Sequence, residues 1–233
     1  MQPHREFRRF AGEYGRYSLI QDRVAQALVA SIERPYGRIV DLGCGSGALF
    51  RAYERPFTHY LAVDISPEML ALHPTGERVG KMVGDFDDPA LFAKLADLDF
   101  DLLLSSSALQ WSRDLGWTLA QIAALKRPVA LSIFTSGTFA SLHEAAGTRS
   151  PIRSKEETIE ALKENFDATI DILKYELYFR DTLSMLRYIK RSGVSGGERM
   201  LGYAATRRLL REYTLPYLEF EVVRMCAPAA AVV

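Results

Sequence analysis

Three glycines and an acid near residue 40 form the part of this chain best suited to chemistry. An apolar strand is predicted to end in Asp41 and to continue through Gly43, Gly45 and Gly47 into a helix. Glycine lets the backbone turn tightly and approach a ligand that any Cβ would block. Such a loop at the carboxyl end of a strand is where an open α/β sheet binds a nucleotide-like ligand. A tight turn without a ligand is the alternative.

The charge beside this loop bears on the choice between two nucleotide ligands. Residues 43–48 also fit the relaxed G-x-G-x-x-G/A pattern of NAD-binding folds. Asp41 argues against NAD, because its carboxylate would repel a pyrophosphate and attract a cation. S-adenosyl-L-methionine (SAM) carries a sulfonium and an ammonium group, and D-x-G-x-G-x-G resembles the first motif of class I SAM-dependent methyltransferases. The sequence therefore favours SAM, with NAD as the alternative.

Acids also end the second and third predicted strands. Asp64 closes strand 60–64 and is placed to accept both ribose hydroxyls, a role that NAD and SAM folds share.

Ser66 is the predicted N-cap of the next helix and Pro67 its first residue. The D-I-S-x-x-M-L run resembles the second methyltransferase motif, and the third strand closes at 83–86. The resemblance implies contacts with the adenine from Ile65, Met69, Asp85 and Phe86. Ordinary core packing is the alternative for the methionine.

The fourth predicted strand, 100–106, brings further polar residues to the cofactor. Ser105 and Gln110 are expected to contact SAM. Trp111 is expected to line the substrate side with an apolar wall and an N–H donor, or else to begin a helix that covers the core. The run 87–89 is interpreted as a helix cap.

Together with a fifth strand at 129–135, these units predict an α/β fold. We expect one Rossmann-like class I methyltransferase domain over 1–233, with a seven-stranded, mostly parallel sheet, helices on both faces and a helical lid. The last two strands are predicted at 175–179 and 217–225. The lid is assigned to the three segments 1–34, 136–165 and 181–214.

Composition narrows the function classes. The 29 Lys and Arg residues balance 29 Asp and Glu, so there is no global basic field of the kind that nucleic-acid binding uses. Cys44 and Cys226 indicate a reducing compartment, and two cysteines at this spacing do not suit a zinc site. No signal-peptide core or membrane-length apolar run is present, so we expect a cytoplasmic protein with no membrane partner. We also expect a monomer without a metal, and a frayed tail at 227–233.

Segments outside these motifs resemble the malonyl-acyl-carrier-protein O-methyltransferases of biotin synthesis. They are an F…Y…Q pattern (7–21), an L-Q-W segment (109–115), an F-T…S-L-x-E segment (134–144) and an R-x-x-K-x-x-G helix (183–193). The likeness covers nearly the whole chain. The chain departs from the family where Lys126-Arg127-Pro128 replaces a Pro-Gly-Gly turn, and where the insert at 147–151 is short.

The resemblance implies methyl esterification of a malonyl thioester on acyl carrier protein, with SAM as cofactor and S-adenosyl-L-homocysteine as product. The free carboxylate is already ionised at neutral pH and needs no general base. It must instead be paired, because an unpaired carboxylate is costly to desolvate. The pairing residues are expected to be Arg187 and Tyr14, followed by Tyr17 and Lys190.

Basic residues of the predicted lid segment 181–214 are candidates for binding the carrier protein. Trp111, Lys190 and Arg191 are expected to face the substrate or carrier, and Arg207, Arg208 and Arg211 make a second basic face. A solvated helix face is the alternative, and coenzyme A is the alternative substrate handle. Other open functions are a methyltransferase for another small carboxylic acid or natural product and a SAM-binding protein without turnover. An RNA or protein methyltransferase is disfavoured, because no N/D-P-P-Y/F motif follows the fourth strand.

Overall fold

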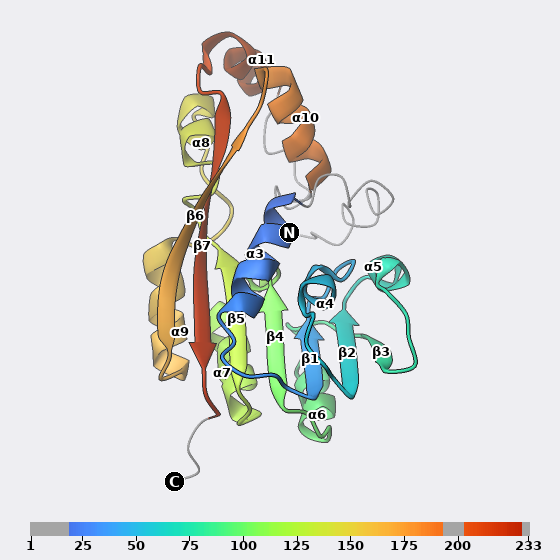
Figure 1. Cartoon of the computed structure of the whole chain (residues 1–233). Coiled ribbons are helices and arrows are strands. Elements are labelled where there is room, and N and C mark those ends of the chain that lie inside the picture. Colours follow the sequence, from blue (N-terminus) through green and yellow to red (C-terminus); the bar gives the residue numbers. More distant parts are fainter. Residues whose placement is uncertain (1–18, 193–202, 230–233) are drawn as a thin grey trace.

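The structure, a computed structural model, describes residues 19–192 and 203–229 (Figure 1). Within them, one sheet has the strand order β3-β2-β1-β4-β5-β7-β6. The strands are β1 (Arg38–Leu42), β2 (His59–Asp64), β3 (Val79–Val83), β4 (Leu102–Ser106), β5 (Val129–Phe134), β6 (Thr169–Tyr178) and β7 (Tyr217–Ala227). The pairs among β1 to β5 are parallel, whereas β7 is antiparallel to both β5 and β6. The predicted fold class is confirmed.

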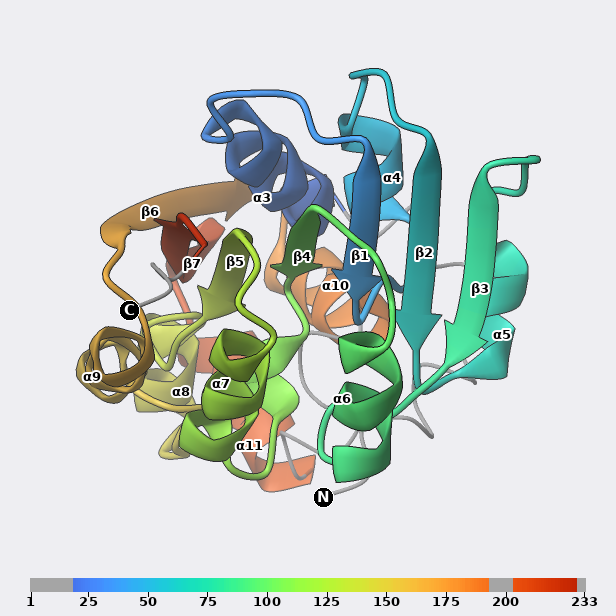
Figure 2. The ribbon, with the colours of Figure 1, turned by 90° about the horizontal axis from the view of Figure 1, so that it is seen from below.

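Helices cover both faces of this sheet. One face carries α3 (Leu19–Ala30) and α4 (Ala48–Ala52); the other carries α6 (Pro89–Ala96), α7 (Leu115–Ala124) and α9 (Lys155–Asn165) (Figure 2). The helix α5 (Pro67–Leu72) packs against β2 and β3. Beyond the carboxyl edge lie α8 (Ala140–Ala146), α10 (Thr182–Ser192) and α11 (Tyr203–Glu212) (Figure 1).

The central strands are mostly apolar because both of their faces are buried. Ile39 and Leu102 pack in the cluster under α3 and α4, while Val40 and Leu103 pack in the cluster under α6, α7 and α9. This alternation follows from the two-residue period of a strand. The order β1–β4 marks the place where the chain changes direction across the sheet, which is the usual ligand position in such folds.

The last two strands are longer than predicted, and they support the lid. β6 and β7 pair from Thr169↔Cys226 to Tyr178↔Tyr217 and extend past the other strands (Figure 1). At their tip a second apolar cluster joins α3, α8, α10 and α11 and includes Met185, Leu209 and Phe220. The lid elements therefore have a hydrophobic core of their own.

Part of the predicted lid belongs to the sheet layer instead. In segment 136–165, α9 packs against α7 and β7, and Leu162 is fully buried in the main core. An amphipathic helix has the same sequence pattern whether it covers the sheet or belongs to the lid. The sequence alone therefore could not show which of these two places α9 takes. Only α8 of this segment lies at the carboxyl edge.

Several local predictions can be compared with the structure. Ser66 caps α5 by accepting from the Met69 amide, with Pro67 at the first turn, as predicted. Asp88 caps α6 through the Ala90 amide, but its neighbour Asp87 does not. The fourth strand begins two residues later than predicted, and Ala227 pairs in β7 rather than fraying. No helix among the described residues is both long and apolar enough to span a bilayer.

Candidate functional site

The loop after β1 has a backbone that only glycine accommodates at two positions. Gly43 and Gly47 adopt φ values of 75° and 91°. A Cβ on Gly43 would lie 2.4 Å from the Cβ of Ala108, and one on Gly47 would lie 2.7 Å from the Cδ of Pro74. Both values are far below van der Waals contact. Gly43 therefore lets the loops after β1 and β4 touch where the sheet changes direction, and Gly47 lets the loop approach the segment that follows α5.

The amides of this loop are engaged within the protein. The N–H groups of Gly43 and Cys44 both donate to the Val63 carbonyl, at 2.8 and 3.0 Å. The Gly45 amide donates to Oδ2 of Asp64 at 2.8 Å. A pyrophosphate site would present such amides to the ligand. The loop instead presents carboxylates, which suits a cationic ligand better.

Asp41 is the most unusual group at the loop. Its side chain is fully buried, and Oδ2 accepts a 2.7 Å hydrogen bond from the Tyr60 hydroxyl. Oδ1 is also buried and has no hydrogen-bond partner among the described residues. Burial, helped by the nearby charge of Asp64, raises the pKa of Asp41 to about 7, although the Tyr60 hydrogen bond opposes the shift. A cation bound here would stabilise the ionised form.

The second acid holds the junction of β2 and α5. Asp64 is half-buried, and its Oδ1 accepts from the Ser66 amide at 2.9 Å. The next residue, Ile65, is half-buried. Met69 is 2% exposed, and its Cε lies 3.5 Å from the position of a Cβ on Gly45. Met69 thus packs under the loop as a core residue, which is the alternative to an adenine contact that the sequence allowed.

The turn after β4 brings a second unpartnered polar atom to the loop. Gln110 is 7% exposed, and its Nε2 donates to the Ser107 carbonyl at 2.7 Å, so Oε1 is an acceptor with no donor in the described part of the chain. Trp111 is half-buried at the end of the same turn. Ser105, by contrast, is fully buried and donates to the Leu42 carbonyl at 2.7 Å. The structure therefore gives Ser105 a supporting role under β1, instead of the predicted cofactor contact.

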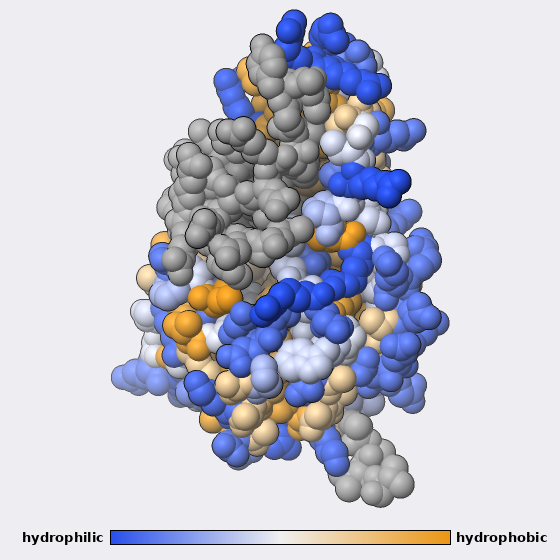
Figure 3. All heavy atoms as spheres, turned by 180° about the vertical axis from the view of Figure 1, so that it is seen from behind, coloured by the Kyte–Doolittle hydropathy of each residue, from blue (hydrophilic) through white to orange (hydrophobic). Residues whose placement is uncertain are grey.

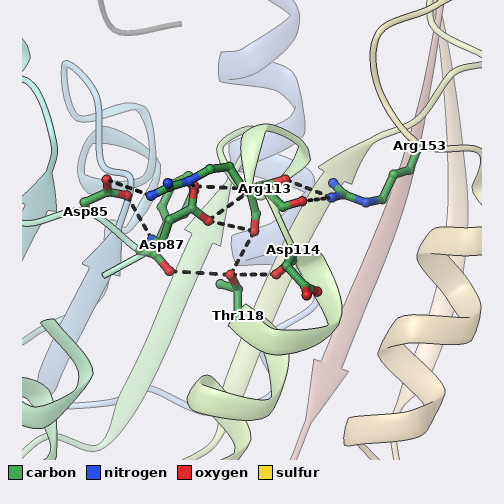
Figure 4. Close-up of polar contacts among 8 residues, drawn as sticks. Asp85, Asp87, Arg113, Asp114, Thr118 and Arg153 are labelled. Carbon is green, nitrogen blue, oxygen red and sulfur yellow. Dashed lines mark hydrogen bonds and ion pairs between the residues drawn. The ribbon is translucent and has the colours of Figure 1, made fainter. Parts of the chain in front are cut away.

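A polar cluster ties together the loops after β3 and β4 and the loop between α8 and α9 (Figure 4). Asp87 accepts from the Ser112 hydroxyl at 3.0 Å and from Nε of Arg113 at 3.0 Å. Asp85 accepts from the Asp87 amide and lies 3.9 Å from Nη2 of Arg113. Arg153 donates to the carbonyls of Ser112 and Arg113 at 2.9 and 3.0 Å, and it forms no ion pair with a described residue. The side chain of Phe86 lies near Gly43, 3.8 Å from the position of its missing Cβ.

The predicted substrate residues are spread over the lid. Arg187 is exposed on α10, and Lys190 and Arg191 belong to the same helix. Tyr14 and Tyr17 lie outside the described residues. Three arginines are exposed on α11: Arg207, Arg208 and Arg211. Seen from behind, the coloured part of the surface at this end of the molecule is mostly hydrophilic, with smaller hydrophobic areas (Figure 3).

Four residues of the site were not singled out by the sequence. Tyr60 was interpreted only as part of a strand, although a tyrosine in an otherwise aliphatic buried strand needs a hydrogen-bond partner. Asp87 was interpreted as a cap. Arg113 and Arg153 carry no local signal, because their partners come from other loops. Among the described residues, no group of His, Cys, Asp and Glu side chains could hold a metal ion.

Comparison with known proteins agrees with this geometry. A family described as "Methyltransferase domain" matches residues 40–131. A malonyl-[acyl-carrier protein] O-methyltransferase from Pseudescherichia vulneris is 30% identical over 198 residues, which cover 81% of this chain and 78% of that protein. The protein of the same name from Chlorobium luteolum is 31% identical over 207 residues, covering 81% and 77%.

Solved structures support the same fold at low identity. A putative methyltransferase from Bacillus halodurans has a TM-score of 0.62 and 12% identity, over 89% of this chain and 99% of that one. A SAM-dependent methyltransferase from Thermotoga maritima, titled a possible histamine N-methyltransferase, has a TM-score of 0.58 and 16% identity, over 96% and 99%. From the sequence relatives, the chain belongs to the malonyl-[acyl-carrier protein] O-methyltransferase family and is a SAM-dependent methyltransferase.

Proposed function

We propose that this chain methylates the free carboxylate of a malonyl thioester on acyl carrier protein, at an early step of biotin synthesis. The observation that carries the proposal is the extent of the sequence match. The relatives of that name align over 198 and 207 residues, which is more than twice the length of the matched methyltransferase domain at 40–131. The likeness therefore includes elements outside the cofactor-binding core, where substrate choice resides.

The buried polar atoms at the loop fit SAM. The unpartnered oxygens of Asp41 and Gln110 are acceptors, which an ammonium group can satisfy with its three donors. Asp64, at the end of β2, is the proposed partner of the ribose hydroxyls. Asp85 and Phe86, at the end of β3, are the proposed adenine contacts. The glycine loop supplies the close backbone approach that a bulky nucleoside requires.

The proposed reaction requires no catalytic acid or base from this chain. When bound, SAM supplies a methyl group on a sulfonium sulfur, and a carboxylate oxygen that displaces the sulfur forms the ester without any proton transfer. The protein's task is to align the carboxylate and to exclude water. Trp111, half-buried beside the loop, is the proposed apolar wall on the substrate side.

The substrate carboxylate needs a cation, and two arginines are candidates. Arg187 on α10 is the one that the resemblance implies. Arg153 is a second candidate, because it is held against the loop that follows Trp111 and forms no ion pair with a described residue. Arg113 is a weaker candidate, since Asp87 already pairs with it.

The lid also offers a surface for an acidic carrier. Arg187 on α10 and Arg207, Arg208 and Arg211 on α11 are exposed, and the same helices carry Leu183 and Leu210, which are 46% and 47% exposed. Such charges steer an acidic partner, while the leucines supply a small apolar contact. Arg208 and Arg211 both approach Glu212, which partly offsets their charge.

Transfer of a labelled methyl group tests the proposal directly. Labelled SAM would be offered with malonyl-carrier protein, malonyl-coenzyme A or acetyl-carrier protein, and with Asp64→Ala as the control variant. We expect a base-labile labelled ester on the malonyl carrier alone, which the variant does not form. Label on a free small acid instead would favour the alternative substrate class. SAM binding with no label on any acceptor would overturn the proposal and favour a protein without turnover.

A further inference from the structure

The edge of the sheet opposite the glycine loop has a groove that the methyl-transfer site does not use. It measures about 430 Å³ and lies where the amino ends of β1, β4 and β5 meet. Figure 2 looks onto this edge. Three chain segments form most of the groove: the loop between α3 and β1, the start of β4 and the turn between α7 and β5. Its lining residues include Arg34, Tyr36, Phe100, Asp101, Lys126 and Arg127.

Three cations of this lining form no ion pair with a described residue. The guanidinium of Arg34 lies 4.5 Å from the centre of the Tyr36 ring, and that of Arg127 lies 5.6 Å from the centre of the Phe100 ring. Stacking on rings orients a guanidinium but leaves its charge unneutralised. Lys126, the third cation, is exposed at the rim.

The one acid in the groove does not offset these charges. Asp101 accepts from the amide of Arg38 at 2.9 Å and from its Nη2 at 2.7 Å. The hydrogen bond from the Arg38 side chain lowers the pKa of Asp101. Arg38 also pairs with Asp99, so these three groups together carry one negative charge. The three cations of the lining exceed it, and the groove keeps a net positive charge.

Lys126 has a backbone conformation that is unfavourable for a residue with a side chain. Lys126 follows the last turn of α7 with a φ of 53°, in the left-handed region that glycine prefers. Lys126 and Arg127 occupy this turn, and strain of this kind is often retained where a side chain is used.

We propose that this groove binds a small organic anion, through a carboxylate or phosphate group held by Arg34, Lys126 and Arg127. The rings of Tyr36 and Phe100 and the nearby prolines give the groove an apolar lining for the body of the ligand. Tyr36 is held in place, because its backbone N–H and C=O both bond to the Tyr53 hydroxyl, at 2.8 and 3.0 Å. The site is separate from the glycine loop and takes a ligand of the opposite charge.

Amide chemical shifts in NMR spectra of the full chain would test this site. The probes are inorganic phosphate, malonate and AMP, each titrated at low salt. We expect saturable shifts at Gly37, Asp101 and Arg127. Tighter binding of AMP than of phosphate would show that the rings hold the ligand body, whereas equal binding would show that the anionic group is sufficient.

Two variants and a control make the test specific. Arg127→Ala and Lys126→Gly are each expected to weaken binding by about tenfold, the usual effect of losing one charge-assisted hydrogen bond. Lys126→Gly suits the positive φ, so it keeps the fold. Lys163→Ala on α9 removes a cation elsewhere and should change nothing. No saturable shift in the groove with any probe would overturn the proposal, as would binding that both groove variants leave unchanged.

Discussion

The glycine loop and the lid lie at the same edge of the sheet but hold their polar groups differently. At the loop, the backbone fixes the geometry, and Asp41 is fully buried with an unpartnered oxygen. In the lid, short helices rest on an apolar cluster and present arginines such as Arg187 to solvent. The loop is thus a rigid region, which we propose binds one cationic ligand, whereas the lid is a surface whose charges can change without disturbing the sheet.

Gly43→Ala should have the largest effect, because it acts on the rigid region. The new Cβ would meet Ala108 at 2.4 Å in a backbone with positive φ. We expect a loss of about 2–4 kcal/mol in the free energy of unfolding, from overpacking and strain together. SAM binding should fall below detection. Urea unfolding and calorimetric titration measure the two effects.

Gly116→Ala is the matched control for this change. Its Cβ would meet only Asp114 at 3.6 Å, within a helix, where alanine is favoured over glycine. It should leave stability and SAM binding essentially unaltered. Equal effects of the two variants would show that the loop is not the rigid region that the comparison requires.

Asp41→Asn separates stability from binding at the same loop. The pKa of Asp41 is raised to about 7, above its value in an unfolded chain. The folded state therefore binds more protons than the unfolded state between about pH 4 and pH 7. Stability without SAM is greatest below this range and falls as the pH rises through it. The variant lacks this loss and should be more stable than the parent at pH 8 by roughly 2–4 kcal/mol, while binding SAM at least about tenfold more weakly.

The measurement is urea unfolding of both proteins at pH 5 and pH 8, with SAM titrations at each pH. In the parent, SAM should bind more tightly at pH 8 than at pH 5, because a proton competes with the cation for Asp41. Tyr60→Phe is the companion variant, since it removes the hydrogen bond that a described residue donates to the Asp41 carboxylate and that favours its ionised form. SAM affinity that is independent of pH would refute a contact between Asp41 and the ligand.

The two regions also differed in how far the sequence predicted them. Asp41 and the glycines could be placed together in one loop from the sequence, because the motif consists of neighbouring residues of fixed type and spacing. Tyr60, Asp87 and Arg153 were missed because each acts on a partner that only the folded chain brings near. Likewise, α9 was assigned to the lid because an amphipathic helix does not reveal which apolar surface it covers. Contacts made by the backbone within a motif can be predicted from one sequence, and contacts between distant loops cannot.

Arg187→Ala should have a smaller effect that is confined to the substrate. If the guanidinium pairs with the malonyl carboxylate, kcat/KM for malonyl-carrier protein should fall about tenfold or more, as is usual for loss of one charged hydrogen bond. The dissociation constant of SAM should be unchanged. Arg153→Ala tests the second candidate in the same assay, and Arg180→Ala is a control for exposed charge near the lid. A fall in all three variants alike would point to steering of the carrier by charge.

Glu219→Gln tests how the lid is attached to β7 and should have the smallest effect. Oε2 of Glu219 accepts from the Ser141 hydroxyl at 2.8 Å, and Oε1 accepts from the Ser141 amide at the start of α8. The same hydroxyl lies 2.8 Å from the Tyr213 hydroxyl after α11, so one carboxylate links two lid elements. The amide group of glutamine keeps only one acceptor, and we expect a local loss of about 1 kcal/mol.

Hydrogen exchange gives the readout, because the loss is local to the lid. Amides of α8 and α11 should exchange roughly fivefold faster in Glu219→Gln, which is the equivalent of about 1 kcal/mol. Amides of β1 and β2, and the affinity for SAM, should not change. Glu160→Gln on α9 provides the control, since that side chain is exposed. Faster exchange that spread to the glycine loop would mean that lid and loop open together, and the two regions would then have to be treated as one cooperative unit.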